Sequence, residues 1–126
     1  MSVFRRRKDA SHSAIVKTFR AMGCSVLVIE SSTAGCPDLA VGCAGRTHLV
    51  ECKPSKSQAA AKKWTLPSEA QAKLHAAWRG SSIPIVHDAK EVSELVQMWR
   101  LEAANADRAA QLLKRELDAV LKAVHQ

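Results

Sequence analysis

The chain has few aromatic residues and no long apolar segment. Tyrosine is absent, and aromatic residues make up 4% of the 126 residues, so there is no ladder of aromatic side chains on which successive bases could stack. No apolar run approaches the roughly 20 residues that span a bilayer. The segment MSVFRRRKDA carries basic residues but not the apolar stretch of a signal peptide. These absences predict a soluble protein of the cytoplasm.

Acidic residues are also scarce relative to basic ones. The chain has 19 Lys and Arg against 12 Asp and Glu, a formal net charge of +7. Such a balance favours a polyanionic partner, because neutralising phosphates releases counterions. The predicted contacts to nucleic acid lie in a basic segment near the start and in a polar loop, and they are Arg5, Arg6, Arg7, Lys8, Lys56, Lys62 and Lys63.

The cysteines lack the close pairing of a zinc knuckle. There are four, Cys24, Cys36, Cys43 and Cys52, and their intervals are longer and less regular than those of structural zinc sites. In a cytoplasmic protein they are expected to be reduced and to behave as small buried hydrophobic residues.

The first half of the chain predicts a helix followed by three strands. Apolar residues recur at helical spacing over residues 11–22, and Gly23 ends that pattern. Residues 25–30 form a β-branched run, and residues 38–41 and 47–53 read as two strands joined by a reversal at 42–46. Residues 54–63 are expected to form an exposed basic loop.

The second half predicts helices around one more strand. Ser68 with Gln71, and Asp88 with Glu91, have the spacing of capping boxes that open helices, and residues 83–87 read as a short strand between them. Beyond Leu101 the tail is expected to be a further helix. Its apolar stripe must pack on the domain or on another copy, and comprises Leu113, Leu117, Val120, Leu121 and Val124.

This order predicts an α/β fold in which helices flank a small mixed sheet, with an extra C-terminal helix. The reversal makes one strand pair antiparallel, and a helical crossover to residues 83–87 allows a parallel pair. We divide the chain into a basic arm at 1–8, a domain at 9–100 and an amphipathic helix at 101–126.

The residues that point to chemistry lie on either side of the reversal. If the turn is centred between Ala44 and Gly45, Asp38 and Glu51 are equidistant from it and face each other across the strands. Lys53 shares their face, while Cys52 points to the other. A hard divalent cation such as Mg²⁺ suits two neighbouring carboxylates, and the Cys52 carbonyl could add a ligand.

Two interpretations of this cluster stay open at this point. In the first, the metal activates a water for attack on a phosphodiester and Lys53 stabilises the developing charge. In the second, Asp38 caps a turn after Pro37, and Glu51 and Lys53 are an ordinary exposed strand pair.

The amino-acid sequence around these residues resembles that of a known family. Pro37-Asp38 followed by Glu51-Cys52-Lys53 is similar to the PD-(D/E)xK nuclease signature, and the segments AIVKTFRAMGCSV, GCPDLAVG, GRTHLVECKP and QAKLHAAWRG resemble the VRR-NUC domains of phage and bacteria. The resemblance runs from about residue 9 to residue 99. It implies a restriction-endonuclease-like core. It also implies that the protein works in the cytoplasm of a bacterial or phage-infected host cell.

The resemblance also implies a site and a substrate. It implies Asp38 and Glu51 as metal ligands, Lys53 as a catalytic residue, Gln71 near the active site, and Mg²⁺ as the cofactor, with Mn²⁺ as a substitute. Small stand-alone members imply homodimers that act on branched DNA such as Holliday junctions. The acidic residue that the first helix often adds has only Asp9 and His12 as nearby candidates.

Two classes of function therefore compete. The first is a metal-dependent DNA endonuclease that hydrolyses phosphodiester bonds. The alternative is a non-catalytic nucleic-acid-binding protein that uses the same basic surface, and it predicts salt-sensitive binding that ignores Mg²⁺. His75, one turn after Gln71, is expected to be a packed or solvated residue of its helix.

Overall fold

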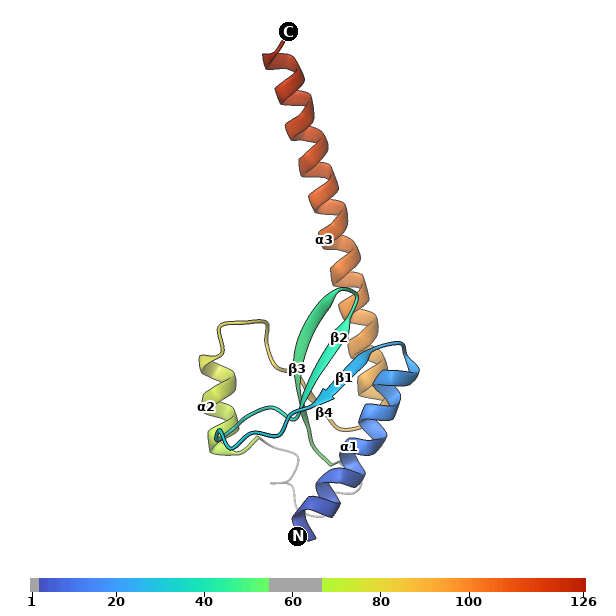
Figure 1. Ribbon diagram of the computed structural model, residues 1–126, viewed down its shortest axis with the longest axis vertical. Helices are drawn as coiled ribbons and strands as arrows, with labels where there is room; N and C mark the ends of the chain where they lie inside the picture. The colour runs from blue at the N-terminus through green and yellow to red at the C-terminus, as the bar shows by residue number, and fades with distance from the viewer. Residues whose placement is uncertain (1–2, 55–66) are drawn as a thin grey trace.

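The protein folds as a small sheet with two long helices on one of its faces (Figure 1). The computed structural model describes residues 3–54 and 67–126, with side chains from His12 onward. The elements in chain order are α1 (Val3–Ala21), β1 (Ser25–Val28), β2 (Leu39–Cys43), β3 (Arg46–Cys52), α2 (Glu69–Ala77), β4 (Ile85–Val86) and α3 (Ala89–Val124).

The strands form one mixed sheet, as the sequence predicts. Their order is β1-β2-β3-β4. The pairs β1–β2 and β2–β3 are antiparallel, and β4 lies parallel to β3. A parallel neighbour requires a crossover, and the segment that contains α2 provides it. The predicted α/β class with a C-terminal helix is thus confirmed.

The β2–β3 hairpin has the predicted register. Ala44 and Gly45 form the turn with φ angles of 52° and 79°, the pair of positive values that suits the right-handed twist of a two-residue hairpin. Leu39 pairs with Val50, and the Asp38 N–H donates to the Val50 carbonyl at 3.1 Å. Asp38 and Glu51 therefore take up the opposed positions expected of them.

The core lies between the sheet and the helices α1 and α3. Side chains alternate along a strand, so one face of the β2–β3 hairpin supplies Leu39, Val41 and Val50 to the core, all fully buried. Phe19 of α1 stacks against Trp99 of α3 at 6.0 Å between ring centroids. The cysteine prediction holds in part, because Cys24, Cys43 and Cys52 are buried and free, whereas Cys36 is partly exposed.

Two helix boundaries differ from the prediction. The backbone of α1 begins at Val3, because no helix-breaking residue separates the basic segment from residues 11–22. The tail helix predicted beyond Leu101 is not separate, since α3 continues unbroken to Val124. No glycine or proline lies between residues 89 and 124 to interrupt it.

The two capping motifs also differ from each other. Ser68 and Gln71 form the complete predicted capping box. At α3, the Asp88 side chain accepts from the Glu91 N–H, but the Glu91 carboxylate accepts from the His87 N–H at 3.0 Å. Asp88 is therefore an N-cap residue without the reciprocal half of a box.

The C-terminal part of α3 extends away from the rest of the protein (Figure 1). The last buried residue of this helix is Ala103. The apolar stripe beyond it does not pack on the described part of the domain, because Leu113, Leu117 and Val124 are 66%, 58% and 71% exposed. In residues 3–54 and 67–126, no helix is long and apolar enough to cross a membrane.

Candidate active site

The two carboxylates singled out from the sequence are among the most buried polar residues of the chain. Asp38 is 3% exposed and Glu51 is 1% exposed. Glu51 is the first residue of β3 that pairs with β4, and its N–H donates to the Pro84 carbonyl at 2.9 Å. Such burial contradicts the interpretation of Glu51 as part of an ordinary exposed strand pair, because ionised groups are seldom buried without partners.

Gln71 of α2 connects Glu51 to Lys53. Its amide nitrogen donates to Glu51 Oε1 at 2.7 Å, and its amide oxygen accepts from Lys53 Nζ at 2.8 Å. The same oxygen accepts from the Ser68 N–H at 2.9 Å, which is the capping interaction. The two roles considered for Gln71 are therefore compatible, since one carboxamide caps α2 and holds the carboxylate and the ammonium in place.

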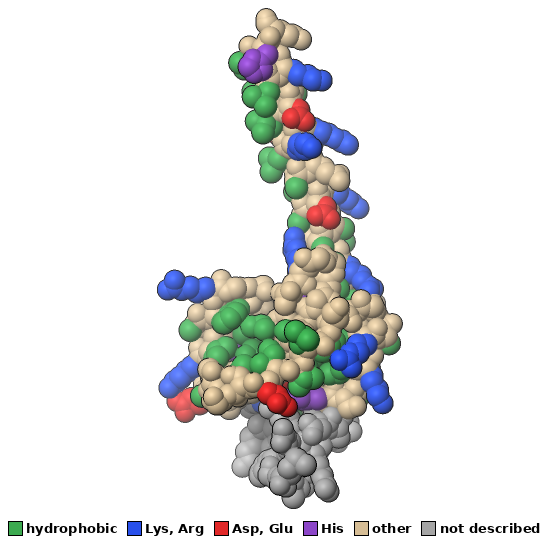
Figure 2. All heavy atoms as spheres, in the orientation of Figure 1, with side chains coloured by type: hydrophobic (Ala, Val, Ile, Leu, Met, Phe, Trp, Pro, Cys, Tyr) green, Lys and Arg blue, Asp and Glu red, His purple; other side chains and the backbone are tan. Residues whose placement is uncertain are grey.

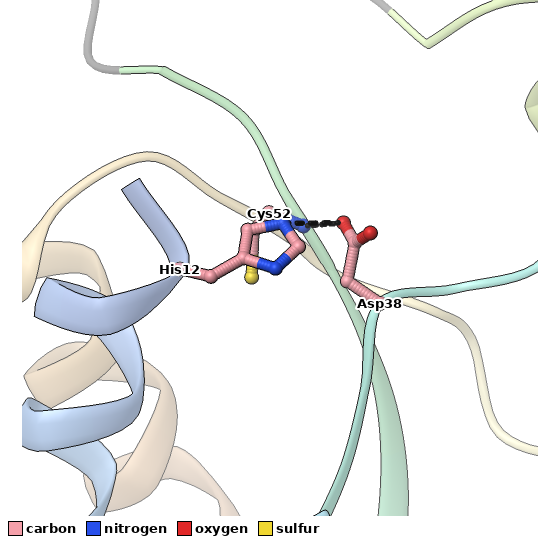
Figure 3. Close-up of side chains that lie close together, drawn as sticks. All are labelled: His12, Asp38 and Cys52. Atoms are coloured by element: carbon pink, nitrogen blue, oxygen red, sulfur yellow. Dashed lines mark hydrogen bonds and ion pairs between the residues drawn. The ribbon is translucent and has the colours of Figure 1, made fainter. Parts of the chain in front are cut away.

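Asp38 is held from two sides (Figure 3). Its Oδ2 atom accepts from the Cys52 N–H at 2.8 Å and lies 3.5 Å from His12 Nε2 of α1. Burial by itself would raise the pKa of Asp38, but its contacts with His12, Glu51 and the Cys52 N–H outweigh it and hold the pKa well below its usual value. Asp38 is therefore ionised at neutral pH.

The carboxylate oxygens of Asp38 and Glu51 are suitable ligands for a cation. Two buried carboxylates whose side chains interact directly offer the hard oxygen ligands that Mg²⁺ prefers. A second possible set shares Asp38, because ligand atoms of His12, Asp38 and Cys52 all lie within 4.8 Å of one another. Its nitrogen and sulfur atoms are softer donors, and its Cys52 thiol belongs to the apolar core. The carboxylate pair thus fits Mg²⁺ and the second set does not.

His75 is close enough to Lys53 to respond to its charge. Burial lowers the pKa of His75, and the positive charge of Lys53 lowers it further. His75 lies one helical turn after Gln71 on α2, so a neutral imidazole borders the cluster near the Lys53 ammonium. This placement is more specific than the packed or solvated role expected from sequence.

The predicted nucleic-acid contacts cannot be placed beside this cluster. Lys56, Lys62 and Lys63 lie outside the described residues. Arg5, Arg6, Arg7 and Lys8 fall within the backbone of α1, in the part whose side chains are not described. The carbonyl of Cys52 belongs to the residue whose N–H holds Asp38, and its role as a metal ligand stays a prediction.

His12 is a residue of the site that the sequence leaves as one of two candidates for the first-helix position. Yet His12, Ile15, Val16 and Phe19 are spaced as one face of a helix, and all four are buried. Extending the apolar pattern by one turn towards the N-terminus was the signal that could have put His12 on the inner face of α1.

One comparison with known proteins bears on the fold. No protein-family model matches the chain, and no curated protein matches it either. A solved structure described as a VRR_NUC domain is similar, with a TM-score of 0.55 and 25% sequence identity over 70% of this chain and 91% of that one. With its mixed four-stranded sheet and flanking helices, the chain therefore has a VRR-NUC fold of the restriction-endonuclease-like, nuclease-family type.

Proposed function

We propose that the protein is a Mg²⁺-dependent DNA endonuclease that hydrolyses phosphodiester bonds. The observation that carries this proposal is the hydrogen-bonded series of Glu51, Gln71 and Lys53 next to the buried Asp38. The amide of Gln71 holds one carboxylate and one ammonium together, beside a second carboxylate that can share a cation, in a fold that nucleases use.

Each residue of the cluster has a role that follows from its chemistry. Asp38 and Glu51 would hold the cation, and a bound Mg²⁺ supplies a Lewis acid for the phosphate and lowers the pKa of a water. Lys53 stabilises negative charge that develops on the phosphate oxygens. Gln71 restricts the Lys53 ammonium and the Glu51 carboxylate to one geometry, which reduces the entropy lost on reaching the transition state.

The substrate that we propose is DNA, recognised by shape and branched, as in a four-way junction. The chain is basic and has no element with the pattern of a groove-reading motif, so affinity would come from phosphates rather than from base edges. We also propose that the protein acts as a homodimer and that Mn²⁺ can replace Mg²⁺.

The test compares cleavage of junction, flap, single-stranded and linear duplex DNA of matched length by the full chain in Mg²⁺, Mn²⁺ or EDTA. Asp38→Asn and Lys53→Ala should lose cutting by at least about 100-fold while keeping the circular dichroism of the parent. Lys73→Ala is the matched control, because Lys73 is 77% exposed on the same helix as Gln71.

The outcomes separate the two classes of function. Cleavage that requires metal and is lost in Asp38→Asn supports the nuclease. Cleavage that is unchanged by both substitutions contradicts it. Tight, salt-sensitive binding in EDTA that survives Glu51→Gln, with no cleavage in any metal, would instead establish the non-catalytic nucleic-acid-binding protein.

A further inference from the structure

Helix α3 carries one apolar stripe, and the other described residues cover it only along its first half. The covered part consists of Val92, Val96, Trp99 and Ala103, all buried. The same alternation of four and three residues continues beyond the body of the protein. We call this continuation the seam, and its residues are Ala106, Ala110, Leu113, Leu117, Val120 and Val124.

The seam has the spacing and the surroundings of a coiled-coil interface. A strict alternation of four and three keeps apolar residues facing a partner helix along its whole length. Arg108, Arg115 and Lys122 recur at intervals of seven on the opposite side of the helix. Figure 2 shows hydrophobic side chains along one edge of this extension and Lys and Arg side chains along the other.

We propose that the seam packs against the seam of a second copy of this chain, with the two helices antiparallel. The proposal deepens the suggested homodimer, and it does not depend on whether the protein cleaves DNA. Because the two copies present the same surface to each other, the contact is isologous and closes as a dimer.

The position of the sheet determines the orientation. Val92, Val96 and Trp99 are buried against the body and lie on the same side of α3 as the seam. A parallel partner helix, lying on the seam, would continue into the space that the body of the first copy occupies. An antiparallel partner ends where that body begins, and its own body lies beyond the end of the first helix.

The sizes of the seam residues favour the same orientation. Small residues, Ala106 and Ala110, lie near the body, and larger ones, Leu113, Leu117 and Val120, lie towards the end of the helix. An antiparallel pair sets the small half of each helix against the large half of the other, whereas a parallel pair would place alanine opposite alanine and leave gaps.

One antiparallel register keeps each seam opposite the other. In this register Leu113 faces Leu117 of the partner subunit, and Ala110 faces Val120 of the partner subunit. A register shifted by one heptad towards the body would set Val124 against the partner subunit's Trp99, which is buried against the body of that copy, so the first register is favoured.

The area is sufficient for a specific dimer. Residues 106–124 span about 28 Å of helix. Four residues of the seam, Leu113, Leu117, Val120 and Val124, are 58–71% exposed, and covering the whole seam in both copies removes on the order of 1,000 Å² from water. Stable interfaces begin at about this size.

The first experiment measures the mass of the full chain by sedimentation equilibrium. We expect twice the mass of the 13.7 kDa chain for the parent protein and a twofold lower mass for Leu113→Lys with Leu117→Lys. The matched control adds the same two charges away from the seam, as Gln111→Lys with Ala119→Lys, and should remain dimeric. All four residues are exposed, and circular dichroism verifies that each variant is folded.

Disulfide cross-linking tests the orientation. In a Cys36→Ser background, Val120→Cys alone should not cross-link, because antiparallel pairing separates the two copies of this residue. A mixture of Val120→Cys with Ala110→Cys should cross-link between unlike chains. Rapid self-cross-linking of Val120→Cys would indicate a parallel pair and overturn the proposed arrangement.

The remaining outcomes are equally decisive. A parent chain that stays monomeric at about 100 μM overturns the proposal, since an interface of this size should associate below that concentration. A dimer that both double-lysine variants leave intact also overturns it. Asp38→Asn should abolish cutting without changing the mass, so failure of the dimer and failure of the nuclease are distinguishable.

Discussion

Replacing Gln71 by alanine should destabilise the protein far more than its partly exposed position on α2 suggests. The substitution removes the donor to Glu51 at 2.7 Å, the acceptor for Lys53 at 2.8 Å and the acceptor for the Ser68 N–H at 2.9 Å. Two of these bonds involve charged partners, and the carboxylate of Glu51 is 1% exposed, so water cannot easily replace its lost donor.

The magnitude follows from those contacts. A hydrogen bond to a charged group contributes about 1.5 kcal/mol or more, and the neutral cap contributes less. Because Lys53 is only partly buried, we expect a total loss of about 3 kcal/mol in the free energy of unfolding. For a domain of this size that loss lowers the Tm by roughly 10 °C.

Urea denaturation followed by circular dichroism measures the effect. Gln71→Met keeps the length of the side chain and should lose nearly as much as Gln71→Ala, because the bonds and not the volume stabilise the site. Lys73→Ala should change little, since its pair with Glu69 is almost fully exposed. A loss below about 1 kcal/mol in both Gln71 variants would refute the argument.

Three further predictions concern other parts of the protein. Burial lowers the pKa of His48 below 6.5, so the unfolded chain binds more protons and the free energy of unfolding falls as the pH drops below about 6.5. His48→Phe should preserve the stack on Trp99, at 3.9 Å between ring centroids. It should also reduce the fall in the free energy of unfolding between about pH 7.5 and 5.5, measured by urea denaturation. Gly35→Ala should cost about 2 kcal/mol or more, because φ is +79° and the new Cβ would meet the Ala70 carbonyl, whereas Gly45→Ala, with the same φ but open space, should cost less in the same assay. Because antiparallel pairing of α3 keeps the two active sites far apart, junction cleavage should proceed by independent nicks, and coupled cuts on a supercoiled cruciform substrate would contradict this.

The register of the hairpin could be derived from sequence because few alternatives exist. Once the turn is centred on Ala44 and Gly45, each later pairing follows from counting, and a shift by one residue would expose Val50 and bury Thr47. The opposed positions of Asp38 and Glu51 were therefore predictable.

Contacts between distant elements could not be derived by counting residues from a turn. That Gln71 reaches Glu51 depends on where α2 lies after a crossover that includes residues 55–66, and no local pattern determines this. The same limit applies to His12, whose approach to Asp38 depends on how α1 packs on the sheet. The predicted break near Leu101 is wrong, because the apolar stripe of the tail continues that of the preceding turns in one helix.

The alternation along β3 has a consequence for how the protein tolerates mutation. His48, Val50 and Cys52 face the core, while Glu51 and Lys53 face the candidate site. In a saturation mutagenesis experiment scored separately for abundance and for DNA cleavage, substitutions at the core-facing positions should lose both properties, whereas those at the site-facing positions should lose cleavage by a larger factor than abundance. Deleting a single codon from this strand exchanges the two sets, so no compensating point mutation elsewhere in the gene should rescue it.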